Sequence, residues 1–166
     1  YDTWHIHLYH AKLRELESGF NMVWEGGFEN EPNKSIAYRT LWRNIENSIS
    51  TRDAHSGKIA CKLLNTEKDV WKDACVQTIN VHKNTDYVVS GWAKSSIAGS
   101  TGSYLGVRLS DGRICDANPS LKTDEWTKIS VMFNTGDCTS LDVFFGTWGA
   151  EGLSVTVDDI SLAPKK

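Results

Sequence analysis

Apolar and polar residues alternate in short runs along most of the chain, beginning near residue 20. Each run is five to ten residues long and rich in β-branched and aromatic side chains, and glycine, asparagine, serine and aspartate separate the runs. The runs cover residues 58–64, 75–81, 86–95, 103–110, 125–133, 141–148 and 153–162. Many short strands, with no convincing helix after residue 20, predict an all-β fold in which two antiparallel sheets form a β-sandwich jelly roll.

The first 19 residues differ from this pattern. Leucines at helical spacing, followed by Gly19, predict a short helical leader over residues 1–19, and residues 20–166 then form the β-jelly-roll domain. The leader is expected to be a linker, a piece of a neighbouring domain or a remnant foreign to the fold. Its three histidines, at positions 5, 7 and 10, have no carboxylate or cysteine at metal-ligand spacing, so we expect a solvated segment.

The last predicted strand contains a change of phase. Apolar residues alternate over 155–157 and again over 160–162, but with opposite parity. The phase slips at Asp158 and Asp159, so one of the two carboxylates is expected to turn inward. Because a buried carboxylate without a partner is costly, the slip predicts either a bound cation or a set of backbone hydrogen bonds around it.

Composition and charge exclude some partners. The net charge is −3, and the 18 Lys and Arg residues are scattered, which argues against nucleic acid and against an anionic membrane surface. No apolar run approaches the roughly 20 residues of a membrane-spanning helix. No signal peptide is visible, although a mature secreted chain would have lost it.

The four cysteines, at positions 61, 75, 115 and 138, form no CxxC pair, so a zinc or redox site is not indicated. An even number of cysteines is compatible both with two disulfides in an exported protein and with free buried thiols.

Sequence templates for catalysis are missing. The chain has no GxSxG, HExxH, P-loop or dinucleotide-binding motif. Acidic pairs such as Asp124 and Glu125 are expected in exposed turns, whereas a glycosidase needs two carboxylates that face each other across a cleft. We therefore expect a non-catalytic protein. A jelly-roll polysaccharide lyase or glycosidase is one alternative, and a structural protein-interaction sandwich is another.

Seven tryptophans are more than core packing usually needs. If Leu105 faces the core, then Tyr104 and Arg108 face outward on the same strand, and Trp148 faces away from the core on its own strand. An aromatic ring packs against the CH face of a sugar while arginine donates hydrogen bonds to its hydroxyls, so these residues are expected to bind carbohydrate. Trp92 is also outward by parity, where it either contacts ligand or covers a sheet edge.

Six segments carry a resemblance to a known family. They are GGFEN (26–30), AHSGKIACKL (54–63), VWKDACVQTINV (70–81), NTDYVVSGWAK (84–94), DEWTKISVMFNTGD (124–137) and VTVDDISL (155–162). In this order they resemble carbohydrate-binding modules of the family 4, 9, 16 and 22 type. The resemblance implies a galactose-binding-like β-jelly roll, stabilised by calcium, that binds polysaccharide and is usually attached to a secreted glycoside hydrolase.

The resemblance also implies a structural calcium site. The ligands carried over are oxygen donors from three separate segments: the Gly27 carbonyl, the Glu29 side chain, the Lys58 carbonyl and Asp158. Calcium prefers such a mixture of carboxylates and backbone carbonyls. Similar modules often have another acidic ligand just before the SGK motif, where this chain has His55, so Asp53 is expected to substitute.

For the carbohydrate, Trp71 stands where related modules carry a sugar-stacking tryptophan, and Arg43 falls near a position that contacts ligand. These expectations describe a secreted, monomeric module that binds a single polysaccharide chain in a concave cleft without cleaving it. Plant cell-wall xylan, β-glucan and mannan are the expected ligand classes, and a covalently linked catalytic domain is the expected partner.

Overall fold

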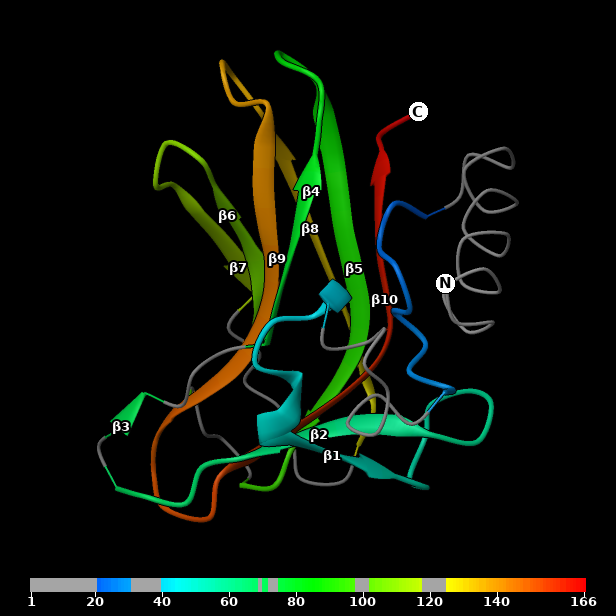
Figure 1. The fold of residues 1–166 in the computed structure, drawn as a ribbon, viewed down its shortest axis with the longest axis vertical. Helices are drawn as coiled ribbons and strands as arrows, with labels where there is room; N and C mark the ends of the chain where they lie inside the picture. Colours follow the sequence, from blue (N-terminus) through cyan, green and yellow to red (C-terminus); the bar gives the residue numbers. More distant parts are fainter. Residues whose placement is uncertain (1–20, 31–39, 69, 72–74, 98–101, 118–124) are drawn as a thin grey trace.

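Figure 1 shows the computed structural model of the chain, which describes residues 21–30, 40–68, 70–71, 75–97, 102–117 and 125–166. The helical leader predicted for residues 1–19 lies outside the described residues. Among those described, no helix has the length and apolar character needed to cross a membrane.

Ten strands form two antiparallel five-stranded sheets in the described part of the chain. The first sheet has the order β1 (Ser48–Thr51), β2 (Ala60–Leu64), β10 (Ser154–Pro164), β5 (Asp86–Ser95) and β8 (Thr127–Asn134). In the second sheet, β9 (Ser140–Gly149) pairs with β3 (Val70–Trp71) and β4 (Cys75–Asn80), and β6 (Ser103–Leu109) lies between β9 and β7 (Ile114–Ala117). A 3-10 turn, η2 (Ile45–Asn47), precedes β1. The predicted sandwich of antiparallel sheets is confirmed.

The long strands coincide with the alternating runs of the sequence, whereas β1, β3 and β7 do not. These three strands have two to four residues. Alternation over so few positions cannot be told from chance, so the sequence pattern does not predict these strands. They are recognised only by their pairing with the longer strands beside them.

The core lies between the inner faces of the two sheets and follows the predicted alternation. Val155 and Val157 of β10, Leu105 and Val107 of β6, and Phe145 of β9 are at most 1% exposed. Burying each such side chain contributes roughly 1.5–3 kcal/mol of hydrophobic stabilisation. Residues between them on each strand point away from the core, so the fold presents two outer sheet faces.

Residues 21–28 connect the two sheets at one side of the sandwich. Gln77 of β4 is buried, and its amide accepts a hydrogen bond from the backbone N–H of Trp24 (2.7 Å) and donates one to the Trp24 carbonyl (2.9 Å). Met22 donates its N–H to the Leu162 carbonyl of β10 (2.8 Å), and the segment runs beside β10 in Figure 1. These contacts hold the first described segment against β4 of one sheet and β10 of the other.

An aromatic cluster fills the space beneath this segment. Phe28, Trp42 and Phe145 lie with ring centroids 5.6 to 5.9 Å apart, and none is exposed. The indole N–H of Trp42 donates to the Trp24 carbonyl (3.0 Å), which satisfies the polar atom of this buried ring.

The phase slip predicted in the last strand is present as an irregularity of β10. Asp158 pairs with Trp92 of β5, the register then shifts before Ser161, and Asp159 has a left-handed backbone with φ of 50°. Asp159 is therefore the additional residue, and Ile160 returns to the core side. The expectation that one of the two carboxylates is buried is confirmed, because Asp158 is 0% exposed. The burial comes from the outer side of the sheet, where the loop between β1 and β2 covers Asp158, and not from the core between the two sheets.

The cysteines are free thiols rather than disulfides. Cys61 and Cys75 are completely buried, and loss of water around the thiol raises the pKa of Cys61 to about 12 and raises that of Cys75 as well. Both thiols stay protonated at neutral pH and act as small apolar core groups.

Candidate functional site

One outer sheet face carries apolar side chains from three strands, and those from two of the strands are aromatic. Val76 of β4, Phe144 of β9 and Tyr104 of β6 pack together as an apolar cluster separate from the main core. The register pairs Val76 with Phe144, and places Tyr104 beside Gly146, which adds no side chain next to the ring. Trp148 has the same parity on β9 and is 48% exposed. We refer to this surface, with the polar residues described next, as the outer β9 face.

A polar group adjoins the apolar cluster. Arg43 donates through Nη1 to the Thr78 hydroxyl (2.7 Å), and that hydroxyl donates to Oδ1 of Asp142 (2.6 Å). The second guanidinium nitrogen of Arg43 lies 3.6 Å from the same carboxylate oxygen. Arg108 of β6 is exposed and is the register partner of Asp142. The face thus places the Asp142 carboxylate of β9 between Arg43, at the edge of β4, and Arg108 of β6, beside exposed aromatic surface.

The structure brings four of the residues singled out in the sequence to this face: Tyr104, Arg108, Trp148 and Arg43. The backbone of Arg43 bridges to Val76, which attaches it to the edge of β4. Sequence reasoning missed Asp142 and Thr78. Asp142 has the same parity as Trp148 and could have been found from alternation, but Thr78 is identified only by the register across strands.

Trp71 is placed by its backbone alone. It lies in β3, where its register partner is Trp148 of β9, while its side chain is outside what the structure describes. The two tryptophan positions therefore lie side by side at one end of the outer β9 face.

Trp92 does not belong to this face. It lies on β5 of the other sheet, and the His55 ring stacks on it with centroids 3.8 Å apart and planes inclined by 14°. The expectation that Trp92 binds ligand together with Tyr104 and Trp148 conflicts with this placement, because a different sheet carries it and a neighbouring side chain covers its ring.

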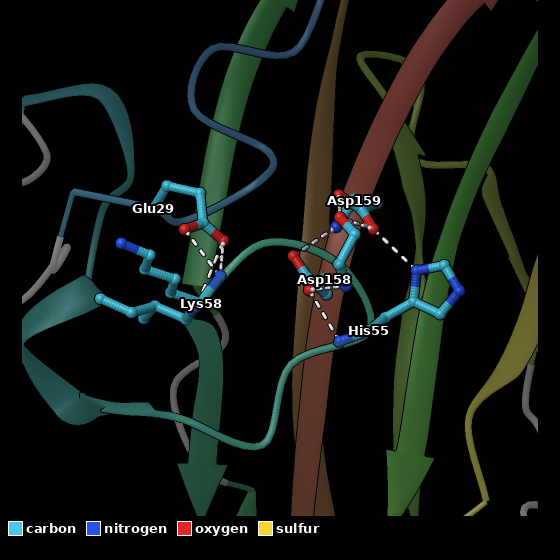
Figure 2. A network of polar contacts seen from close by, with 7 residues as sticks. Glu29, His55, Lys58, Asp158 and Asp159 are labelled. Carbon is cyan, nitrogen blue, oxygen red and sulfur yellow. Dashed lines mark hydrogen bonds and ion pairs between the residues drawn. The ribbon is translucent and has the colours of Figure 1, made fainter.

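The residues predicted to bind calcium gather around the loop of residues 53–59. Figure 2 shows Glu29 on one side of this loop and Asp158 with Asp159 on the other. The Glu29 carboxylate accepts the backbone N–H groups of Lys58 (3.0 Å) and Ile59 (3.2 Å). We refer to the 53–59 loop with these three carboxylates as the loop junction.

Asp158 and Asp159 hold the other half of the loop. Asp158 accepts the N–H groups of His55 (3.0 Å) and Ser56 (3.2 Å), and Asp159 accepts the Ser56 hydroxyl at 2.7 Å. Burial raises the pKa of Asp158 to about 6, the Asp159 charge adds to this, and the backbone hydrogen bonds oppose it. The raised pKa means that the buried carboxylate is incompletely compensated by its neighbours.

The donor set at the loop junction fits a calcium ion in its chemistry. Three carboxylates from segments far apart in sequence meet at one loop, and within the described residues no lysine or arginine forms an ion pair with them. A Cβ on Gly27 would lie 3.9 Å from Oδ1 of Asp159, so the Gly27 backbone is close by. The described part of the chain contains no cluster of three or more His, Cys, Asp or Glu side chains arranged for a metal. A cation here would therefore depend on backbone carbonyls for part of its shell, as calcium sites commonly do.

Asp53 is engaged elsewhere. Its carboxylate pairs with the ammonium group of Lys94 on β5, whose side chain is 8% exposed and lies 5.0 Å from the ring centroid of Trp126. This partner weakens the case for Asp53 as the additional calcium ligand, because releasing it would leave a nearly buried lysine without its counter-charge.

Comparison with known proteins identifies similar sequences and folds. A family model described as a carbohydrate binding domain matches residues 21–154, while no match is found among curated proteins. A family 16 carbohydrate-binding module is similar in structure, with a TM-score of 0.66 and 18% identity over 86% of this chain and 99% of its own.

Two further similar structures are described with a bound sugar. A family 61 module in complex with β-1,4-galactotriose has a TM-score of 0.58 and 17% identity over 87% of this chain and 99% of its own. The family 22 and catalytic modules of a Clostridium thermocellum endo-1,4-β-D-xylanase, complexed with xylohexaose, have a TM-score of 0.59 and 14% identity; the match covers 87% of this chain and 28% of that longer one. At these identities the structural likeness establishes the fold.

Proposed function

Because the chain belongs to the carbohydrate binding domain family whose model spans residues 21–154, we propose that it binds a polysaccharide chain on the outer β9 face without cleaving it. The single observation that carries this proposal is the composition of that face. Exposed Trp148 and half-buried Tyr104 lie on the same side as Arg43, Asp142 and Arg108.

The chemistry of this face suits a sugar. An exposed aromatic ring packs against the CH face of a pyranose, and desolvation of both surfaces favours binding. The carboxylate of Asp142 accepts hydrogen bonds from sugar hydroxyls, while Arg43 and Arg108 donate to them. Arg43 and Thr78 already hold Asp142 in one orientation, which lowers the entropy lost on binding.

The ligand class that we propose is a plant cell-wall β-glycan such as xylan, β-glucan or mannan. Similar folds are described with xylohexaose and with β-1,4-galactotriose, which supports an uncharged β-linked chain as the ligand. We further propose that the module is a secreted monomer and that it brings an attached glycoside hydrolase to its substrate. The attached hydrolase is supported by the similar family 22 module, which occurs in one chain with a family 10 glycoside hydrolase module.

A catalytic alternative is less well supported. Hydrolysis of a glycosidic bond normally requires two carboxylates on opposite sides of the scissile bond. Among the described side chains of the outer β9 face, Asp142 is the carboxylate, and it is already paired with Arg43. Release of reducing or unsaturated ends from polysaccharide by the purified protein would instead favour the lyase or glycosidase alternative.

Affinity electrophoresis in gels containing soluble polysaccharides tests the proposed function. Trp148→Ala and Trp71→Ala should each weaken binding by roughly thirtyfold, because loss of an aromatic ring that is desolvated on binding typically costs about 2 kcal/mol or more. Met132→Ala removes a 57% exposed side chain from the other sheet and should leave binding unchanged. If no polysaccharide retards the wild-type protein, or if Trp148→Ala binds like wild type, the outer β9 face is not the binding surface.

We also propose that the loop junction binds a structural calcium ion, with Glu29, Asp158 and the carbonyls of Gly27 and Lys58 as ligands. Bound there, calcium would supply the positive charge that the buried Asp158 carboxylate lacks. The residues themselves already connect residues 21–30, the 53–59 loop and β10 through hydrogen bonds.

A further inference from the structure

The ring of His55 is held by groups from three different segments. It stacks on Trp92 at 3.8 Å and meets the ring of Trp126 edge-on at 5.9 Å. Its Nδ1 lies 2.8 Å from Oδ2 of Asp159, at hydrogen-bond distance. Rotation of this side chain would break both an aromatic stack and a hydrogen bond to a carboxylate.

The backbone at His55 is held as well. Its N–H donates to Oδ2 of Asp158 at 3.0 Å, and the next N–H, of Ser56, donates to the same oxygen at 3.2 Å. Figure 2 shows the backbone N–H of His55 directed toward Asp158 and its ring directed toward Asp159. One residue therefore contacts both adjacent carboxylates, Asp158 through its backbone and Asp159 through its ring.

The position of Trp92 explains how this contact is kept in place. Trp92 is the register partner of Asp158 on the neighbouring strand, so the ring that supports His55 stands directly beside the carboxylate that its backbone binds. The left-handed conformation of Asp159 places this residue outside the regular pairing of β10 with β5. The Trp92 platform and both carboxylates are thus supplied by two adjacent strands, β5 and β10, while the 53–59 loop supplies His55 and Ser56.

We infer that His55 is a positioning residue, which uses Trp92 as a platform to hold the 53–59 loop on Asp158 and Asp159. The loop is thereby fixed before a cation binds. On the opposite side of the loop, the Lys58 N–H keeps its hydrogen bond to the Glu29 carboxylate. This assigns Trp92 to support of the loop junction. The part of the inference that concerns calcium rests on the proposed calcium site, whereas the part that concerns loop order does not.

Substitutions at His55 separate the two contacts of its ring. His55→Ala removes the stack and the hydrogen bond, His55→Phe keeps a ring on Trp92 without the bond to Asp159, and His55→Asn keeps a short polar group without the stack. His82→Ala is the matched control, because His82 is an exposed histidine whose ring forms no hydrogen bond, ion pair or aromatic stack with the described residues. Three quantities are measured on each variant of the 166-residue chain: amide hydrogen exchange over residues 54–59 without metal, tryptophan fluorescence, and the Kd for calcium.

We expect His55→Ala to accelerate exchange of the His55 and Ser56 amides by about tenfold or more, because the loop then opens locally without global unfolding. Its calcium Kd should rise by about tenfold, the lower end of what loss of a group that orients metal ligands typically causes. Fluorescence should change because the imidazole leaves Trp92. The Phe and Asn variants should each recover part of the protection, and polysaccharide affinity should stay within about twofold of wild type because the binding face is on the other sheet.

The inference is overturned if His55→Ala leaves the exchange of the loop amides at the wild-type rate. It is also overturned if His55→Phe restores full protection, since the bond to Asp159 would then contribute nothing. If the wild-type protein binds no calcium, the proposed calcium role fails, and the exchange measurement alone decides the role of His55. If His55→Ala does not fold, the Phe and Asn variants provide the same comparison.

Discussion

At the scale of single residues, the face of the sheet on which a side chain lies decides whether its polar atoms contact water or the protein interior. Thr147 and Trp148 are adjacent on β9, yet Thr147 is completely buried while Trp148 is 48% exposed. The hydroxyl of Thr147 has no hydrogen-bond partner in the described part of the structure. A buried, unpaired hydroxyl costs about 1–3 kcal/mol, so this residue is a source of instability in the core.

Thr147→Val should therefore raise the free energy of unfolding by about 1 kcal/mol, because it replaces the unpaired hydroxyl with a methyl group of similar shape. Thr135→Val is the matched control: Thr135 is equally buried, but its hydroxyl donates to the His82 carbonyl at 2.6 Å and accepts the Thr85 N–H at 3.0 Å. The control should lose stability. Urea denaturation measures both, and a loss of stability in Thr147→Val would show that its hydroxyl has a partner, such as a buried water.

Asp142→Ala tests the polar part of the outer β9 face. It should weaken polysaccharide binding by about tenfold, which corresponds to the net value of a hydrogen bond to a charged group. The melting temperature should stay near that of wild type, because the ion pair with Arg43 is partly exposed and contributes little. Titration calorimetry with a soluble polysaccharide measures the affinity, and Asp137→Ala, an exposed carboxylate in a turn, is the control. Unchanged affinity would limit sugar contacts to the aromatic residues.

At the scale of elements, the loop between β1 and β2 is shaped by the carboxylates it meets. Gly57 has a left-handed backbone with φ of 65°, and a Cβ there would lie 2.2 Å from Oε1 of Glu29. Glycine is required for both reasons, since the Glu29 carboxylate occupies the space of the missing side chain while it accepts the amides of Lys58 and Ile59. The Glu29 carboxylate consequently joins the loop to residues 21–30.

Gly57→Ala should destabilise the protein by about 2–4 kcal/mol, the sum of left-handed strain and weakened hydrogen bonds to Glu29. Gly136→Ala is the control, because Gly136 has a similar φ of 55° but its Cβ would meet only the flexible Arg113 side chain at 3.2 Å. Thermal unfolding followed by circular dichroism compares the two. Equal losses in both variants would mean that backbone strain alone matters and that Glu29 does not constrain the loop.

At the scale of the whole molecule, the loop junction connects the beginning and the end of the domain. Residues 21–30 and β10 are separated by more than a hundred residues, and both bind the same loop. Closing so long a segment costs conformational entropy, which a bound cation at the contact would help to offset. Stability of the entire sandwich should therefore respond to calcium.

Removal of calcium with EDTA should lower the melting temperature by roughly 5–10 °C. A ligand at a hundredfold excess over its Kd stabilises the folded state by about 2.7 kcal/mol. For a chain of this size, each kcal/mol of stability changes the melting temperature by about 2–4 °C. Readdition of calcium should restore the transition. Identical melting curves with and without EDTA, and no metal in elemental analysis, would contradict the proposed site.

Deletion of residues 1–19 should leave thermal unfolding and polysaccharide affinity nearly unchanged. The alternating strand pattern begins near residue 20, and the first contacts with β10 involve Asn21 and Met22. Expression of the shortened chain, followed by melting and gel retardation, measures both properties. A shortened chain that is recovered only as aggregate would show that the leader is part of the fold.

The sequence by itself determined the elements that depend on long alternation. A period of two predicts seven of the strands, the inward positions Leu105 and Val107, and the outward positions Tyr104, Arg108 and Trp148. This alternation is a property of each strand alone, so it can be read without knowing which strands pair. The phase slip at Asp158 and Asp159 was visible for the same reason.

Only the tertiary structure decided which segments meet. Alternation assigns a side to Trp92 and Trp148 on their own strands but cannot tell that these strands belong to different sheets. The contact of Thr78 with Asp142 depends on register between β4 and β9. The burial of Asp158 on the outer side of its sheet depends on a loop about a hundred residues earlier in the chain. Such contacts are set by long-range packing, and no local pattern of residues encodes them.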